Sequence, residues 1–519
     1  MRRLALLATV VGTPALFSIP GCSCSLEGDR TPAGATVAVD PRLAHVRELV
    51  VEEVTSGATP SLSLAVALDG EVLWEEAFGL ADKARGTLAT PHTMYHLGSI
   101  AKPMTATAVM QLAEAGLVDL DAPIERYLGG LTLHYRVASP EEVTVRRVLQ
   151  HRAGLPPHNQ LFFVDEEPEG RPLHETVRRY GQILFDPGQS FIYSNLGYQL
   201  LARLVEQVSG MPFPRYMRER VFAPLGMADA EVYTRDALPT GAALSYYGVN
   251  GEPVPQNTSA YFGNGDVYCS AHDLLRFALF HLDNPLPDQR GVLADSTIAS
   301  MRRQEPPDNT EYGLGWWFDV DELGLRLVYH GGQTTGVSNL LVMTPSQNLA
   351  YVILANTDYD AERLLRIHRA IRAALIPGSG EAHLAGSDSA QSEADEPAPD
   401  ESPAPQLSEG MVGEWQGQIV AYDREIELTL VLDSEGGAIA KLAGQPEQPI
   451  DLSYASDSFL LGTFAGSIPT PDIAPYDHSV RLAVVRTGTT LAGQATAVGW
   501  REDRQTECEL SSWIELKRK

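Results

Sequence analysis

Cysteine is scarce in this chain of 519 residues, where it occurs only as Cys22, Cys24, Cys269 and Cys508. The first two lie in one short N-terminal segment, and the other two are far apart in the sequence. Cysteines placed in this way do not form a disulfide framework, and no CxxC pair or histidine-rich cluster suggests a metal site. We therefore expect a fold that does not depend on disulfides, and we predict no metal or organic cofactor.

Basic residues are also few, since 39 Lys and Arg stand against 67 Asp and Glu and give a formal net charge of -28. This balance argues against a general nucleic-acid-binding protein, which needs a basic surface. It also weakens the case for electrostatic adhesion to anionic lipid, and its simplest interpretation is solubility. A chain of this length is expected to form two or more domains.

Long apolar runs are confined to the N-terminus, where residues 4–19 follow two arginines. This pattern is typical of a signal peptide and is short for a membrane span. The run ends in IPGC, which resembles a bacterial lipoprotein processing site, although its proline departs from the usual small or aliphatic residue. Residues 1–22 are therefore predicted to be a signal peptide with acylation at Cys22, and ordinary cleavage nearby is the alternative. We expect an exported bacterial lipoprotein of the periplasm or cell envelope, with this anchor as its only membrane contact.

Residues 41–377 have the pattern of an α+β domain, and residues 23–40 are expected to be a tether. A helical pattern and a hairpin with a turn at Asp69-Gly70 open the domain, and strands and a helix close it. The middle is rich in helical patterns. The simplest assembly is one antiparallel sheet with both terminal helices on one face and a mostly helical region inserted between the two halves of the sheet.

The composition changes after Pro377. Residues 378–407 are acidic and proline-rich, so they cannot bury a core and are predicted to be a linker. Residues 408–519 return to alternation, with an apolar residue at every second position from Ile426 to Leu432. This predicts a small all-β, barrel-like domain. The domain could shape a cleft, bind cell wall or only add stability, and the sequence leaves these alternatives open.

Ser99 and Lys102 stand three residues apart near the start of a predicted helix. A serine hydroxyl needs a nearby base to act as a nucleophile. A lysine can serve if desolvation lowers its pKa, and the helix N-terminus offers backbone N–H groups to an oxyanion. The alternative interpretation is a capping serine beside a solvated lysine. Taken alone, the Ser99 and Lys102 pair favours this alternative.

Two further motifs change that interpretation: Tyr193-Ser194-Asn195 and His330-Gly331-Gly332. With the Ser-x-x-Lys pair, and in this order, they resemble the serine beta-lactamase and penicillin-binding protein family, specifically its class C-like branch. That branch includes D-Ala-D-Ala carboxypeptidases, D-aminopeptidases and esterases. The segments LQHRAGLP, GNGDVYCSAHDLLRFA and YGLGWWF support the resemblance, which covers about residues 40–377.

The resemblance implies an acyl-enzyme mechanism. Ser99 would attack the acyl carbonyl, and Lys102 would accept or relay its proton. Tyr193 would act as a base in acylation and help to activate water in deacylation, so we assign the role of base to Lys102 and Tyr193 jointly. Asn195 would hydrogen-bond Lys102 and a substrate amide. The backbone N–H groups of Ser99 and Gln333 would form the oxyanion hole.

The strand residues Gly331 and Gly332 would border the substrate. His330 stands where family members mostly carry lysine, whose fixed charge attracts a substrate carboxylate. An unperturbed imidazole titrates near about pH 6.5, so beta-lactam hydrolysis is expected to be weak and carboxylated substrates are expected to bind better as the pH falls. Three other residues are interpreted as structural: His151, Trp316 and Trp317.

The predicted function is that of an exported serine hydrolase acting on an ester, a D-amino-acid peptide or a beta-lactam, in that order. The substrate is a small molecule or a piece of peptidoglycan, no nucleic acid is expected as a partner, and the oligomeric state is not predicted. The alternative is a penicillin-binding or sensor-type protein that keeps a stable acyl adduct, which slow deacylation would reveal. The intact motifs argue against a third possibility, a wall-binding module with an inactive hydrolase scaffold.

Overall fold

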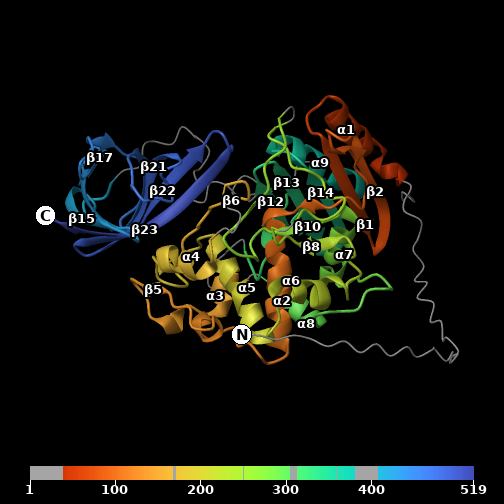
Figure 1. Ribbon diagram of the computed structural model, residues 1–519, viewed down its shortest axis with the longest axis horizontal. Helices are drawn as coiled ribbons and strands as arrows, with labels where there is room; N and C mark the ends of the chain where they lie inside the picture. The colour runs from red at the N-terminus through yellow and green to blue at the C-terminus, as the bar shows by residue number, and fades with distance from the viewer. Residues whose placement is uncertain are drawn as a thin grey trace, which may run out of the picture. The chain divides into compact units, whose positions relative to one another are not determined.

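The computed structural model describes residues 39–166, 171–235, 237–248, 251–303, 312–358, 360–379 and 407–519 (Figure 1). Cys22 and the expected signal peptide, nearly all of the tether and nearly all of the linker lie outside these residues. Within the described ranges, no helix is long and apolar enough to cross a membrane. Cys269 and Cys508 are both buried free thiols. All of the described residues belong to one compact unit, Val37–Lys519.

A seven-stranded antiparallel sheet is built from both ends of the first domain, in the order β11-β12-β13-β14-β1-β2-β3. β1 pairs with β14, with Leu62 opposite Ala355, so the first and last strands of the domain lie side by side. Asp69 and Gly70 form the turn between β1 and β2 with φ of 52° and 79°, as a tight hairpin turn requires. The strands are β1 (Ser61–Leu68), β2 (Glu71–Asp82), β3 (Thr87–Leu88), β11 (Trp317–Val320), β12 (Arg326–Thr334), β13 (Val337–Thr344) and β14 (Leu349–Ala355).

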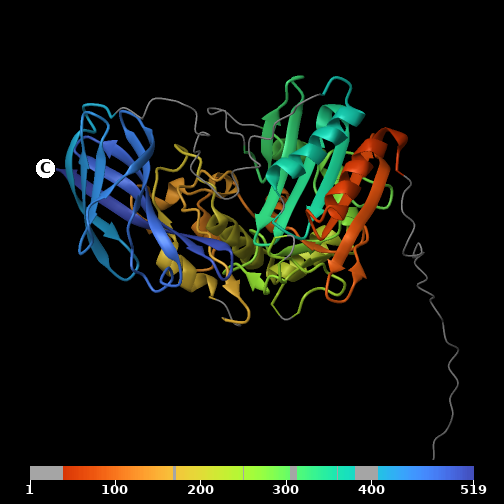
Figure 2. The ribbon, with the colours of Figure 1, turned by 90° about the horizontal axis from the view of Figure 1, so that it is seen from above.

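The two terminal helices, α1 (Ala44–Thr55) and α9 (Ala361–Leu375), pack together on one face of this sheet (Figure 2). Their apolar side chains share one core with every second residue of β1, from Leu62 to Val66. The intervening Ala65 of β1 belongs to the core on the other face. β1 is therefore buried on both faces, and the predicted α+β arrangement is confirmed.

The region between the two halves of the sheet covers the other face and is mostly helical. Its helices are α2 (Ala101–Glu114), α3 (Val145–Leu149), α4 (Leu173–Tyr180), α5 (Asn195–Ser209), α6 (Phe213–Tyr216), α7 (Ala271–His281) and α8 (Asp295–Met301). Short strands connect them: β4 (Tyr95–His96), β5 (His134–Tyr135), β6 (Phe162–Phe163), β7 (Gln182–Ile183), β8 (Ala230–Val232), β9 (Asn257–Thr258) and β10 (Val267–Cys269).

α2 runs through the middle of this region and is buried at every residue from Ala101 to Met110. A helix that is buried all round needs apolar or small side chains on every face. The polar exceptions are satisfied internally, since the Thr105 hydroxyl donates to the Gly263 carbonyl at 2.8 Å. Because of this burial, the N-terminal end of α2 is fixed between the sheet and the helices packed around it.

The C-terminal region is a single nine-stranded antiparallel sheet that curls into a nearly closed barrel, in the order β18-β17-β16-β15-β23-β22-β21-β20-β19 (Figure 1). Every second residue from Ile426 to Leu432 is buried, as predicted. The strands are β15 (Gly413–Val420), β16 (Glu425–Leu432), β17 (Ala438–Leu442), β18 (Gln448–Pro449), β19 (Asp451–Ala455), β20 (Phe459–Ala465), β21 (Asp477–Thr487), β22 (Thr490–Arg501) and β23 (Thr506–Arg518).

Candidate active site

Ser99 lies in a short 3-10 turn that leads directly into α2. Gly98 has a φ of 55°, and a Cβ there would lie 3.1 Å from the backbone nitrogen of Gln333 in β12. A Cβ on Gly332 would lie 1.9 Å from the carbonyl oxygen of Leu97. The turn and the strand can approach this closely only because both positions are glycine. The predicted oxyanion donors, the backbone nitrogens of Ser99 and Gln333, therefore belong to two segments in direct contact.

Lys102 is fully buried behind Ser99. Its ammonium nitrogen donates to the Ser99 hydroxyl at 2.9 Å, to the Asn195 side-chain oxygen at 2.8 Å and to the Asn264 carbonyl at 3.2 Å. A buried cation is tolerated when hydrogen bonds replace its hydration, and three acceptors match the three N–H groups of an ammonium. The structure thus brings Ser99, Lys102 and Asn195 together around one nitrogen.

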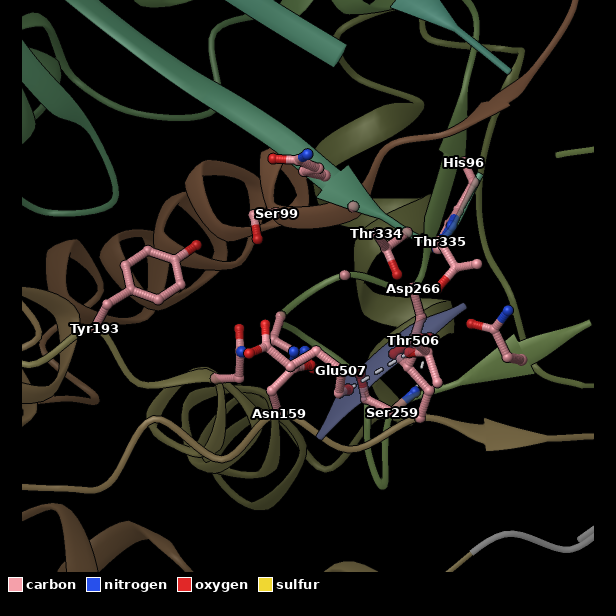
Figure 3. A pocket seen from close by; sticks show the side chains of 17 residues that line it. His96, Ser99, Asn159, Tyr193, Ser259, Asp266, Thr334, Thr335, Thr506 and Glu507 are labelled. Carbon is pink, nitrogen blue, oxygen red and sulfur yellow. Dashed lines mark hydrogen bonds between the residues drawn. The ribbon is translucent and has the colours of Figure 1, made fainter. Parts of the chain in front are cut away.

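Tyr193 completes this group from the segment before α5. Its ring centroid lies 4.4 Å from the Lys102 nitrogen, and the ring stacks on His151 at 4.2 Å and on Trp317 at 6.0 Å. In Figure 3 its hydroxyl is directed toward the side of the pocket where Ser99 lies. Contacts with these two rings and with the Lys102 nitrogen restrict the movement of the phenol.

His151 was expected to be structural, and it packs against the face of the Tyr193 ring. The backbone N–H of Ser194 donates to its Nδ1 at 2.8 Å. Burial, together with the charge of Lys102, holds the pKa of His151 well below its ordinary value, so the imidazole is neutral. Trp316 lies in the hydrophobic core, whereas Trp317 is half-buried.

The surroundings of His330 contradict the protonation state that was expected for its side chain. It is buried, its Nδ1–H donates to the Gly331 carbonyl at 2.6 Å, and its Nε2 accepts from the Tyr312 hydroxyl at 3.1 Å. Burial and the nearby Lys102 charge lower the pKa of His330 to about 3. The expectation that this imidazole titrates near neutral pH and attracts a substrate carboxylate is therefore wrong, because the side chain is desolvated and already hydrogen-bonded on both nitrogens.

A pocket opens beside Ser99 (Figure 3). Four predicted residues line it, namely Ser99, Tyr193, Asn195 and Gln333, and its described lining contains no lysine or arginine. The remaining lining residues are His96, Gly98, Asn159, Leu161, Asn257, Ser259, Asn264, Gly265, Asp266, Thr334, Thr335, Thr506 and Glu507. No group of three or more His, Cys, Asp or Glu side chains suited to a metal ion occurs in the described ranges.

The family model for Beta-lactamase matches residues 46–376. The chain belongs to the beta-lactamase family. It is similar to penicillin-binding protein 4 of Amycolatopsis lactamdurans, with 32% identity over 340 residues that cover 60% of this chain and 85% of that protein. It is also similar to penicillin-binding protein 4* of Bacillus subtilis (strain 168), with 27% identity over 326 residues that cover 58% of this chain and 69% of that protein.

A solved structure described as SurE with D-Leu has a TM-score of 0.61 and 23% sequence identity, and it covers 90% of this chain and 99% of that chain. This coverage extends well beyond the beta-lactamase match, so the likeness includes the C-terminal barrel. At this identity it concerns the fold alone. The predicted general class, a serine hydrolase of the beta-lactamase and penicillin-binding protein type, is confirmed by the family match and by the first of these relatives.

Sequence reasoning missed most of the pocket. Asn264 and Asp266 lie in the segment GNGDVYC, which supported the family resemblance but was given no role in the site. The glycines of this segment were the only local sign that it could belong to the pocket. Thr506 and Glu507 belong to the C-terminal barrel and reach the pocket from about 400 residues away in the chain. Nothing local in their sequence marks them as pocket residues.

Proposed function

We propose that this protein hydrolyses acyl compounds through a covalent intermediate on Ser99, with esters first, D-amino-acid peptides second and beta-lactams third among its substrates. The observation that supports this most directly is the 2.9 Å contact between the buried Lys102 nitrogen and the Ser99 hydroxyl. A base within hydrogen-bond reach of the nucleophile is the geometry that acyl transfer needs.

In the proposed acylation step, the Ser99 oxygen bonds to the substrate carbonyl carbon. Its proton passes to Lys102, once the ammonium described above has lost a proton and become the amine, or to Tyr193 in its phenolate form. The backbone N–H groups of Ser99 and Gln333 would stabilise the oxyanion. The intermediate then expels the leaving group, which takes up the proton. Water then attacks the acyl carbon while the same base takes its proton, the bond between the acyl carbon and the Ser99 oxygen breaks, and that oxygen takes up the proton, so that the carboxylic acid is released and the serine hydroxyl is restored.

The order of substrates rests on charge. Two carboxylates, of Asp266 and Glu507, line the pocket, and its described lining holds no lysine or arginine. Burial raises the pKa of both carboxyl groups to about 7, so above this pH a beta-lactam that carries a carboxylate would meet negative charge there, whereas a neutral ester would not be affected. The similarity to proteins named as penicillin-binding proteins keeps beta-lactams among the candidates. We also propose export and anchoring at Cys22, on the evidence of the N-terminal sequence.

Parallel turnover assays with p-nitrophenyl acetate, nitrocefin and a D-alanyl peptide test the proposal. A fluorophosphonate probe should label the peptide that contains Ser99, and Ser99→Ala should abolish labelling and lower turnover at least about a thousandfold. Ser458→Ala, at an exposed position in the barrel, is the matched control and should behave as wild type. Undiminished ester turnover in Ser99→Ala would refute the mechanism. A burst without turnover would favour the stable-adduct alternative.

A further inference from the structure

His158 has an unusual backbone conformation for a buried side chain beside an active site. Its φ is 57°, in the left-handed region that residues other than glycine seldom adopt. A Cβ is strained in this region, and such strain persists where the surrounding structure fixes it, often at functional sites. The contacts on either side of His158 show what its conformation holds in place.

The two residues before His158 hold the chain at the start of α5. The Pro157 carbonyl accepts a hydrogen bond from the backbone N–H of Asn195 at 2.8 Å. The Pro156 carbonyl accepts one from the Ser194 hydroxyl at 2.6 Å. Because the ring of proline fixes φ, these two carbonyls belong to a stiff piece of backbone. The position of the segment before α5 therefore depends on the position of this piece.

That segment carries two residues of the candidate active site. Asn195 accepts the 2.8 Å hydrogen bond from Lys102, and the Tyr193 ring centroid lies 4.4 Å from the same nitrogen. A shift of the segment would take an acceptor away from the buried ammonium and move the phenol relative to Ser99. Misplacement by about 1 Å is enough to slow an enzyme reaction about a hundredfold.

The residue after His158 contacts a different part of the molecule. Asn159 lines the pocket (Figure 3), and it exchanges two backbone hydrogen bonds of 3.2 and 2.8 Å with Glu509 of β23. The chain thus changes direction at His158, between the contact of Pro157 with α5 and the contact of Asn159 with β23. An extended or right-handed φ at His158 would redirect the chain and separate these two contacts.

The His158 side chain acts by packing. Its ring lies 5.1 Å from the Tyr180 ring, and neither ring nitrogen has a hydrogen-bond partner among the described residues. Burial, with the charge of Arg171 adding to it, lowers the pKa of His158 to about 3, so the imidazole is neutral. The imidazole therefore has no proton to exchange near neutral pH, and the backbone conformation is the feature that a substitution can keep or destroy.

We propose that His158 is a positioning residue, whose left-handed backbone conformation keeps Asn195 and the Tyr193 ring in place beside the buried lysine. The inference rests on the proposed function and concerns the rate at which Ser99 is acylated. Glycine and asparagine adopt the left-handed region more readily than other residues and should replace His158, whereas a β-branched residue should not.

Inactivation by a fluorophosphonate probe tests the proposal, because it reports acylation of Ser99 alone. His158→Val should lower the inactivation rate constant at saturating probe about a hundredfold, with little change in the probe concentration that gives half of this rate. His158→Asn and His158→Gly should stay within about threefold of wild type, since both keep the conformation.

Asp69→Val is the matched control. Asp69 has a φ of 52° in the turn between β1 and β2 and does not line the pocket. This variant introduces the same strain elsewhere, so it should lower the melting temperature but acylate at the wild-type rate. A merely structural role of His158 would make His158→Val behave in the same way, and this result would overturn the proposal.

Equal losses in His158→Val, His158→Asn and His158→Gly would also overturn it, because the ring and not the backbone would then be responsible. If His158→Val does not fold, His158→Ala takes its place, since a single methyl group strains the left-handed region less than a branched side chain. The expected order is unchanged, with the alanine variant slower than the asparagine and glycine variants.

Hydrogen exchange measured by mass spectrometry gives a readout that needs no catalysis. The peptide that contains the Asn195 N–H should exchange faster in His158→Val than in wild type or Asp69→Val, because the bond to Pro157 is weakened. If Ser99→Ala loses labelling but His158→Val acylates and exchanges as wild type, only this inference fails. If Ser99→Ala is still labelled, the proposed function fails, and the exchange comparison still decides whether His158 holds Asn195.

Discussion

The side-chain nitrogen of Lys102 lies 2.9 Å from the hydroxyl oxygen of Ser99, and both side chains come from the first turns of one buried helical segment. The same nitrogen faces the Tyr193 ring. Two candidate bases therefore lie beside the proposed nucleophile, and their contributions can be separated because Tyr193→Phe removes only the hydroxyl and keeps the ring that stacks on His151.

We expect Lys102→Ala to slow acylation by a fluorophosphonate at least about a thousandfold, because the contact to Ser99 is lost. Tyr193→Phe should slow acylation or deacylation about a hundredfold, a typical contribution of a positioned acid or base. Pre-steady-state bursts with p-nitrophenyl acetate separate the two steps. A variant that acylates and deacylates at wild-type rates would exclude its residue as the base.

The buried, neutral His330 should contribute to the pH dependence of stability. Its pKa is about 3 in the folded chain and about 6.5 when unfolded, so the unfolded state binds the extra proton between these values. The contribution of His330 to stability is therefore present above about pH 6.5 and declines by about 1.4 kcal/mol per pH unit below it. His330→Gln should be destabilised relative to wild type at pH 7.5, and this difference should shrink toward pH 5.

Urea denaturation of both proteins at the two pH values measures this difference. Tyr312→Phe is the matched control, since it removes the hydrogen bond to His330 Nε2 but keeps the imidazole. It should cost about 1 kcal/mol at both pH values. A constant difference between His330→Gln and wild type across the pH range would mean that the imidazole is accessible to protons in the folded chain.

Asp472 of the C-terminal barrel should stabilise the contact with α4. Its buried carboxylate accepts hydrogen bonds from Arg171 at 2.8 Å, from Arg179 at 2.7 Å and from the Tyr180 hydroxyl. Asp472→Asn should lower the free energy of unfolding by about 3 kcal/mol, because Arg171 loses its counterion and Arg179 keeps only its ion pair with Glu175. The control Asp477→Asn, at the exposed start of β21, should stay within about 0.5 kcal/mol of wild type.

The same contact predicts the behaviour of a nicked chain. Limited proteolysis is expected to cut within residues 378–407, whose acidic, proline-rich composition marks the predicted linker. The two fragments of the wild type should then elute together in gel filtration, and those of Asp472→Asn should separate more readily at high salt. Immediate separation of the wild-type fragments would show that the barrel is not held by these ion pairs.

Acylation of the N-terminus can be tested by metabolic labelling with palmitate in a bacterial host. The apolar run that ends at Cys22 predicts a labelled, membrane-associated protein. Cys22→Ala should lose the label, and Cys24→Ser should keep it. Label retained in Cys22→Ala would exclude this site, and an unlabelled, secreted wild type would favour ordinary signal cleavage.

Local pattern was enough to predict the α+β arrangement. The alternation of residues in β1 and β16 follows from the two-residue repeat of a strand, and the Asp69-Gly70 turn follows from its need for positive φ. The Ser99 and Lys102 pair could also be found in the sequence, because a spacing of three places two side chains on one face of a helix. The order of the three motifs was enough to indicate the family.

The protonation state of His330 and the position of Glu507 in the pocket depend on contacts between segments that are far apart in the sequence. His330 lies within a strand pattern, and this pattern does not show which side chains surround the imidazole. Burial against Tyr312 and near Lys102 keeps the imidazole neutral. Glu507 looks like any polar strand residue, and it enters the pocket because Arg504 and Glu509 fasten its hairpin there. Desolvation and long-range contacts set these properties, and both arise only when the distant segments have packed.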